Sequence, residues 1–179
     1  MNGKIIRFGS FNVTTQVFYQ SARSYGLVNL KPILPGHVLV CPLRPVDRIS
    51  GLTTEEASDF YATVHKISKA IQKYYKADGL NISIQDGPLA GQSVPHVHCH
   101  IIPRKLSDLP NIDDIYRLLD DKTGDLDHVF QIIKENRRTE AFGVDSDSRP
   151  PRAVSDMEEE AQRLRKFLEE EDRLEDTQN

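Results

Sequence analysis

Three of the six histidines alternate with apolar residues in the segment His-Val-His-Cys-His-Ile-Ile, residues 96–102. Successive side chains of a β-strand point to opposite faces, so this spacing predicts a strand that presents His96, His98 and His100 on one face. The opposite face of that strand carries the apolar residues Val97, Cys99 and Ile101. A row of imidazoles backed by a hydrophobic core favours a rigid, preorganised site.

Imidazole titrates at about pH 6.5, so near neutral pH it can act as a nucleophile, a base or an acid. His98 has a like neighbour on each side, so one neighbour could orient it while the other donates a proton to a leaving group. Attack of a ring nitrogen on a phosphate gives a phosphoramidate that water can hydrolyse. This two-step route requires no metal.

Two other interpretations of the histidine row stay open. Zinc binds imidazole in tetrahedral sites. Same-face neighbours on a strand lie about 6.6 to 6.8 Å apart and the outer two about 13 Å apart. Three histidines on one strand therefore do not converge easily on one ion, and His37 or Cys41 would have to complete the site. The other interpretation is a strand of ordinary surface histidines.

A loop rich in glycine and proline, residues 86–95, stands directly before the histidines. Glycine lets backbone N–H groups approach a ligand closely, and such groups bind phosphate oxygens. Gln92 and Ser93 add side-chain donors. Loops of this composition most often only turn the chain, but the position of this one favours phosphate binding.

Three further polar residues lie in or beside expected strands: Asn29, His37 and Gln85. A lone histidine at a strand start, such as His37, is more often structural than catalytic. Gln85 could donate its amide to a phosphate or face solvent. Asn29, among apolar neighbours, could contact a ribose or lie on a solvated face.

The order of elements predicts an α+β fold. Strands are expected over residues 5–8, 16–20, 25–30, 37–41, 80–85 and 96–102, the last ended by Pro103. A long helix is expected over 54–76, because Thr53 and Glu56 form a capping-box pattern and apolar residues recur every three or four positions. Shorter helices are expected over 112–120, 126–136 and 156–173.

The 179 residues suit one domain. We expect a core over 1–120, a variable and flexible segment over 121–155, and an acidic helix and tail over 156–179. The net charge of −4 argues against a general nucleic-acid binder. The chain has no apolar run of about 18 residues and no signal-peptide core, so no membrane association is expected. Two cysteines favour a reducing compartment, the cytoplasm or nucleus.

Residues 96–102 match the motif His-φ-His-φ-His-φ-φ, where φ is apolar, of the histidine triad (HIT) superfamily. Together with 27–32, 35–46 and 85–94, they make the chain similar to the fragile histidine triad branch over about residues 5–120. The resemblance implies a bis(5'-adenosyl)-triphosphatase that cleaves diadenosine triphosphate and related dinucleoside polyphosphates to AMP and ADP through a nucleotidyl-histidine intermediate. It also implies a HIT-like fold with a five-stranded antiparallel sheet, a long helix and a C-terminal helix. Two such sheets would join into a ten-stranded sheet in a homodimer.

The resemblance also assigns roles to residues. His98 would attack the α-phosphate and carry AMP, His100 would protonate or bind the leaving group, and His96 and His37 would orient the cluster. Substrate contacts are implied for Asn29 (ribose), for Gln85, Gly91, Gln92, Ser93, Val94 and His100 (phosphates), and for Phe8 and Phe11 (base). No tightly bound cofactor and no protein ligands for a metal are expected, and Mg²⁺ or Mn²⁺ would only assist the substrate.

Two alternative functions follow from the same residues. The other large branch of the superfamily cleaves adenosine phosphoramidates with the same nucleophile, although its loop before the triad differs from residues 85–94. A nucleotide-binding signalling module is the second alternative. It is suggested by Tyr116, which matches a tyrosine that is phosphorylated in the family.

Overall fold

The computed structural model describes residues 5–120 and 151–177 and has the expected α+β architecture. Five strands form one antiparallel sheet in the order β3-β4-β5-β7-β6. Their bounds are Val17–Gln20 (β3), Ser24–Val28 (β4), Val38–Pro42 (β5), Gly79–Ile84 (β6) and Cys99–Arg104 (β7). A separate hairpin pairs Arg7–Phe8 (β1) with Phe11–Asn12 (β2). The expected five-stranded sheet is confirmed.

Within the described residues, three α-helices accompany the sheet, over Thr54–Tyr75 (α1), Asp114–Asp120 (α2) and Val154–Asp176 (α4). Single 3-10 turns cover Thr14–Gln16, Ile49–Gly51 and Pro88–Ala90. The helix expected over 126–136 lies outside the described residues. Among the described residues, no helix is long and apolar enough to cross a bilayer.

The long helix α1 begins at the predicted capping box. Thr53 Oγ1 accepts a hydrogen bond from the Glu56 backbone N–H at 3.2 Å, and Glu56 Oε2 accepts one from the Thr53 N–H at 2.9 Å. These two bonds satisfy N–H groups that the first helical turn leaves without a partner. The buried face of the helix carries Phe60, Val64, Ile67 and Ile71.

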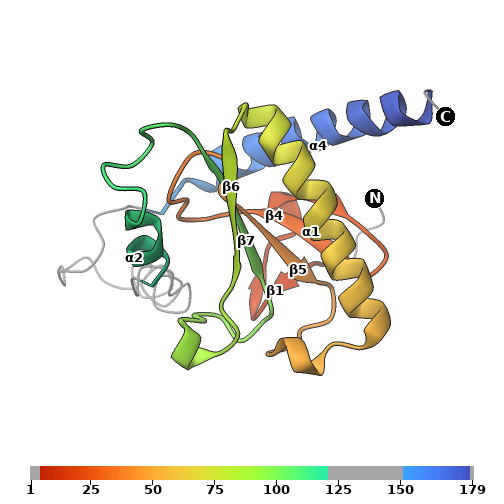
Figure 1. The fold of residues 1–179 in the computed structure, drawn as a ribbon. Coiled ribbons are helices and arrows are strands. Elements are labelled where there is room, and N and C mark those ends of the chain that lie inside the picture. Colours follow the sequence, from red (N-terminus) through yellow and green to blue (C-terminus); the bar gives the residue numbers. More distant parts are fainter. Residues whose placement is uncertain (1–4, 121–150, 178–179) are drawn as a thin grey trace.

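The two faces of the sheet are covered by different elements. The register places Gly26, Val40 and Cys99 on one face, and a Cβ on Gly26 would lie 2.6 Å from Ile67 Cδ1 of α1. We call this the α1 face. The opposite face carries Leu27, Leu39, His100 and Ser83. Figure 1 shows α2 on this second side of β6 and β7, and we call it the α2 face.

The close approach of α1 to Gly26 gives a stability prediction. We expect Gly26→Val to lower the free energy of unfolding by about 1 to 3 kcal/mol, because its side chain would overlap Ile67 and Phe18 in the packed core. Denaturant unfolding would measure the change. The control is Gly79→Ala, since a Cβ there meets no atom within 4 Å. Equal stability of Gly26→Val and the unmodified protein would show that this contact is not tight.

Helix α4 packs through the apolar residues Met157, Ala161, Leu164 and Leu168, all of them buried. Three ion pairs join it to α1: Lys66–Asp172, Lys69–Glu175 and Lys73–Glu171. Exposed ion pairs each contribute at most about 1 kcal/mol. The apolar stripe is therefore the main attachment of this helix.

The strand expected over 96–102 is displaced in the structure. β7 begins at Cys99, because the preceding residues bond outside the sheet: the Val97 N–H donates to the Val46 carbonyl at 2.7 Å. Pro103 does not end the strand. β5 pairs with β7 only as far as Ile101, so at Pro103 only the β6 side requires hydrogen bonds and the missing N–H is tolerated.

Candidate active site

His98 lies just before β7 and is buried, with Nδ1 2.8 Å from the backbone carbonyl oxygen of His96. A carbonyl only accepts hydrogen bonds, so Nδ1 carries the proton and Nε2 has the free electron pair. Burial lowers the pKa of His98 to about 4, because the charged ring would lose its hydration. His98 is therefore a neutral imidazole at pH 7, held in one tautomer, as a nitrogen nucleophile requires.

His100 and His37 form a second chain of hydrogen bonds. The Ile33 backbone N–H donates to His37 Nδ1 at 3.1 Å, so the proton of the neutral His37 ring is on Nε2. His37 Nε2 lies 2.9 Å from His100 Nδ1 and donates to it. The remaining nitrogen of His100, Nε2, consequently carries an N–H group. One backbone amide thus determines the tautomers of two rings.

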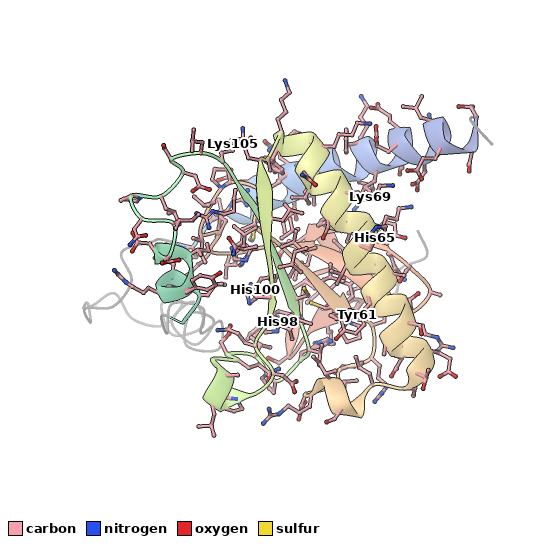
Figure 2. The ribbon with its side chains drawn as sticks, viewed as in Figure 1. Tyr61, His65, Lys69, His98, His100 and Lys105 are labelled. Carbon is pink, nitrogen blue, oxygen red and sulfur yellow. The ribbon has the colours of Figure 1, made fainter. Side chains whose placement is uncertain are left out.

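The rings of His98 and His100 lie 5.0 Å apart between centroids, at an interplanar angle of 72°. Burial, with His98 as a second cause, holds the pKa of His100 well below its ordinary value. A lone pair on His98 therefore stands beside an N–H on His100. Figure 2 shows both residues at β6 and β7, whereas the labelled Tyr61, His65 and Lys69 lie along α1.

His96 differs from the other two histidines of the motif. Its Nδ1 accepts from the Gly9 backbone N–H at 3.0 Å and its Nε2 donates to the Pro42 carbonyl at 2.8 Å. The ring is completely buried, and both nitrogens are engaged. The prediction of three imidazoles on one strand is wrong for His96 and His98, because the strand begins at Cys99 and only His100 belongs to it. His96 instead joins the N-terminal hairpin to the end of β5.

Asn29 lies in the same cluster and not on a solvated face. Its amide nitrogen is 3.3 Å from Nδ1 and 3.1 Å from Nε2 of His37, and its Oδ1 accepts from the Lys31 N–H. Gln85 follows β6 on the α2 face and donates its amide to the Leu119 carbonyl of α2 at 3.2 Å. This bond brings the end of α2 beside the histidines.

The loop before the triad is fastened to residues 47–49. Arg48 Nη1 donates to the Asp86 carbonyl at 2.5 Å, and the Ile49 N–H donates to Asp86 Oδ1 at 2.9 Å. Gln92 donates its amide to the Asp47 carbonyl at 2.9 Å, so this side chain holds the loop in place. Arg48 did not emerge from the sequence, because nothing in the local pattern indicates a contact 38 residues away.

Two glycines shape this loop, Gly87 with φ 112° and Gly91 with φ 88°. A Cβ on Gly87 would fall 1.6 Å from Arg48 Nη1 and would displace the guanidinium, and the positive φ of this residue independently favours glycine. Gly91 is exposed, Ser93 is half-buried, and Val94 is buried against Gly9. The backbone of this loop therefore turns sharply just before the nucleophile.

The two N-terminal phenylalanines are opposed in the β1–β2 hairpin. Phe8 is buried and meets the His98 ring edge-on, with centroids 5.3 Å apart. Phe11 is half-buried and packs on the hydrophobic core. Phe8 therefore supports the His98 ring directly.

Within the described residues, no group of three or more histidine, cysteine, aspartate or glutamate side chains could hold a metal ion. His37 Nε2 and His100 Nδ1 share a hydrogen bond, and both His96 nitrogens bond to the backbone. These four ring nitrogens are thus engaged otherwise.

The three histidines of the motif make stability depend on pH. Burial lowers the pKa of His96, His98 and His100, so below about pH 6.5 the unfolded chain binds protons that the folded chain does not. We expect stability to be full above pH 6.5 and to fall between pH 6.5 and 4, with about 3 kcal/mol lost through His98. Urea unfolding at pH 7 and pH 5 would measure this fall. A His65→Gln control should show the same slope, because His65 is exposed, and a flat profile would contradict the prediction.

Comparison with known proteins agrees with the family resemblance of residues 96–102. A family model, the HIT domain, matches residues 10–106. A bis(5'-nucleosyl)-tetraphosphatase (asymmetrical) of Schizosaccharomyces pombe is 43% identical over 177 residues, which cover 94% of this chain and 97% of that protein. A bis(5'-adenosyl)-triphosphatase of Saccharomyces cerevisiae is 43% identical over 195 residues, covering 93% of each.

Solved structures show the same fold. The C. elegans NitFhit protein superimposes with a TM-score of 0.68 at 30% identity, over 93% of this chain and 31% of that one. A Plasmodium falciparum diadenosine triphosphate hydrolase bound to cyclomarin A gives a TM-score of 0.69 at 27% identity, over 95% and 88% of the two chains.

Proposed function

Since this chain belongs to the HIT domain family, we propose that it is a hydrolase that cleaves diadenosine triphosphate and related dinucleoside polyphosphates to AMP and ADP. The HIT domain match and the two similar hydrolases confirm the family resemblance based on residues 96–102. One observation carries the proposed chemistry: a neutral His98 with a free Nε2 lies beside a His100 that offers an N–H.

In the first step, His98 Nε2 attacks the α-phosphorus. The bond from phosphorus to the bridging oxygen breaks, and its electron pair leaves with ADP, whose oxygen accepts a hydrogen bond from His100 Nε2–H. The adduct ring becomes positively charged, and its Nδ1–H bond to the His96 carbonyl is strengthened by that charge. Water then attacks phosphorus and releases a proton to solvent, and the electron pair of the P–N bond returns to His98.

The other site residues have proposed roles in binding. The backbone N–H groups of Ser93 and Val94 are proposed to bind phosphate oxygens, whereas those of Gly91 and Gln92 donate to the Pro88 and Gly87 carbonyls. Asn29 is proposed to bind ribose, and Phe8 and Phe11 to border the base. Gln85 and Gln92 donate to protein carbonyls, so either amide would exchange partners to reach a phosphate.

The direct test is to incubate the protein with diadenosine triphosphate and tetraphosphate and to separate the nucleotides by ion-exchange chromatography. AMP and ADP are expected from the triphosphate. Parallel reactions with EDTA, Mg²⁺ or Mn²⁺ would show whether the cation only assists. Faster cleavage of adenosine phosphoramidate than of either dinucleotide would assign the chain to the other activity, and no cleavage of any substrate would refute the proposal.

A homodimer is the proposed assembly. β6 is the last strand of the sheet, so its outer backbone groups are available for pairing with another strand. Ile82 on this strand is 49% exposed, which is large for an isoleucine. We expect light scattering to give twice the monomer mass and Ile82→Glu to give a monomer. A monomeric unmodified protein would contradict this assembly.

Cytoplasmic and nuclear placement stays a prediction.

A further inference from the structure

Two buried polar atoms near the nucleophile have no hydrogen-bond partner among the described residues, Ser83 Oγ and His100 Nε2. Ser83 and His100 are directly opposed in the β6–β7 ladder. Side chains of opposed residues point to the same face, with Cβ atoms about 4.5 to 5.5 Å apart. The Ser83 hydroxyl therefore lies on the α2 face beside the imidazole that offers its N–H.

The neighbours of Ser83 on this face of β6 are already engaged. Asn81 Oδ1 accepts a hydrogen bond from Arg104 Nη1 at 2.7 Å, and Gln85 donates to the Leu119 carbonyl at 3.2 Å. Between these two bonds, Ser83 has a buried hydroxyl that no described residue engages. A buried polar group without a partner destabilises the fold, and a ligand oxygen bonded to it would remove that cost.

A hydroxyl and an imidazole N–H side by side form a pair of hydrogen-bond donors, which suits a phosphate group with its charged oxygens. We propose that Ser83 determines specificity for the leaving group, an inference that rests on the proposed function. Its hydroxyl donates to a non-bridging oxygen of the phosphate that leaves with the bridging oxygen, which is the terminal phosphate of ADP. His100 Nε2–H donates to the bridging oxygen itself.

The contact does not change the bonds that are made and broken. His98 Nε2 forms the bond to phosphorus, the bridging P–O bond breaks with its electron pair leaving on ADP, and Ser83 keeps its proton throughout. An amine leaving group has no oxygen at this position. Ser83 thus favours polyphosphates over phosphoramidates.

The test compares Ser83→Ala with Ser68→Ala. Ser68 is the matched control, because its hydroxyl is also buried and without a partner among the described residues but belongs to α1. We expect Ser83→Ala to lower kcat/KM for diadenosine triphosphate by about tenfold, as for one lost hydrogen bond to a charged group. Cleavage of adenosine phosphoramidate should change less than about twofold on the same grounds, and Ser68→Ala should change neither.

Binding provides a readout that does not depend on turnover. Calorimetry should show that Ser83→Ala weakens the binding of ADP by about tenfold. The binding of AMP, which lacks the second phosphate, should be unaffected. Equal losses for both substrates, or for both nucleotides, would show that Ser83 only supports His100 and would overturn the proposal. No loss for either would overturn it as well. If the unmodified protein cleaves neither substrate, the proposed function fails, and the ADP-to-AMP comparison still decides the role of Ser83.

Discussion

His98→Asn is expected to lower kcat for diadenosine triphosphate by about 10⁴-fold or more, because the attacking nitrogen is removed and only substrate binding remains. Asparagine occupies part of the same volume and can still donate to the His96 carbonyl, so the fold should be kept. AMP and ADP formation followed by chromatography, with circular dichroism of the same samples, measures both effects.

The adduct offers a second measurement for the same residue. Rapid alkaline quench, followed by digestion and peptide mass spectrometry of the unmodified protein without an acid step, should find AMP on His98 and on no other histidine. His65→Asn is the control, since His65 lies exposed on α1 away from His98 (Figure 2). An adduct on His100, or a His98→Asn rate within a few-fold of the unmodified protein, would mean that the nucleophile is a different group.

His37→Phe should have the second largest effect, a fall in kcat of about 10² to 10³-fold, which is the usual contribution of a placed proton donor. His37 Nε2–H holds the proton of His100 on Nε2 by occupying Nδ1. Without that bond, His100 can place its proton on either nitrogen and no longer presents a fixed donor to the leaving group.

His37→Gln separates this positioning role from a general loss of structure. Glutamine has an N–H to donate and a carbonyl oxygen for the Ile33 N–H, so it should recover about tenfold of the lost rate. Nitrogen NMR of labelled histidines should find the Nε2–H form of His100 in the unmodified protein and a mixture in His37→Phe. A single unchanged tautomer in His37→Phe, together with full activity, would show that the chain from Ile33 does not control His100.

The elements of this chain follow closely from local sequence. The capping box of Thr53 and Glu56 and the apolar face of α1 depend on residues three or four positions apart, and both are present. The alternation in β6 and in Cys99–Arg104 is equally local. The chemistry is local as well, because three closely spaced histidines indicate an imidazole that attacks phosphorus.

The sequence by itself therefore determined most of the elements, the family and the residue types of the site, but not where β7 begins and ends. Only the tertiary structure decided what each histidine can do, because ring protonation depends on partners far along the chain. His96 is engaged by Gly9, 87 residues away, and His100 by His37, 63 residues away. Periodicity reports which face a side chain occupies but not which donor or acceptor meets it there. Those partners meet only when the sheet, the hairpin and the loops pack together, and that packing leaves one lone pair on His98 and one N–H on His100.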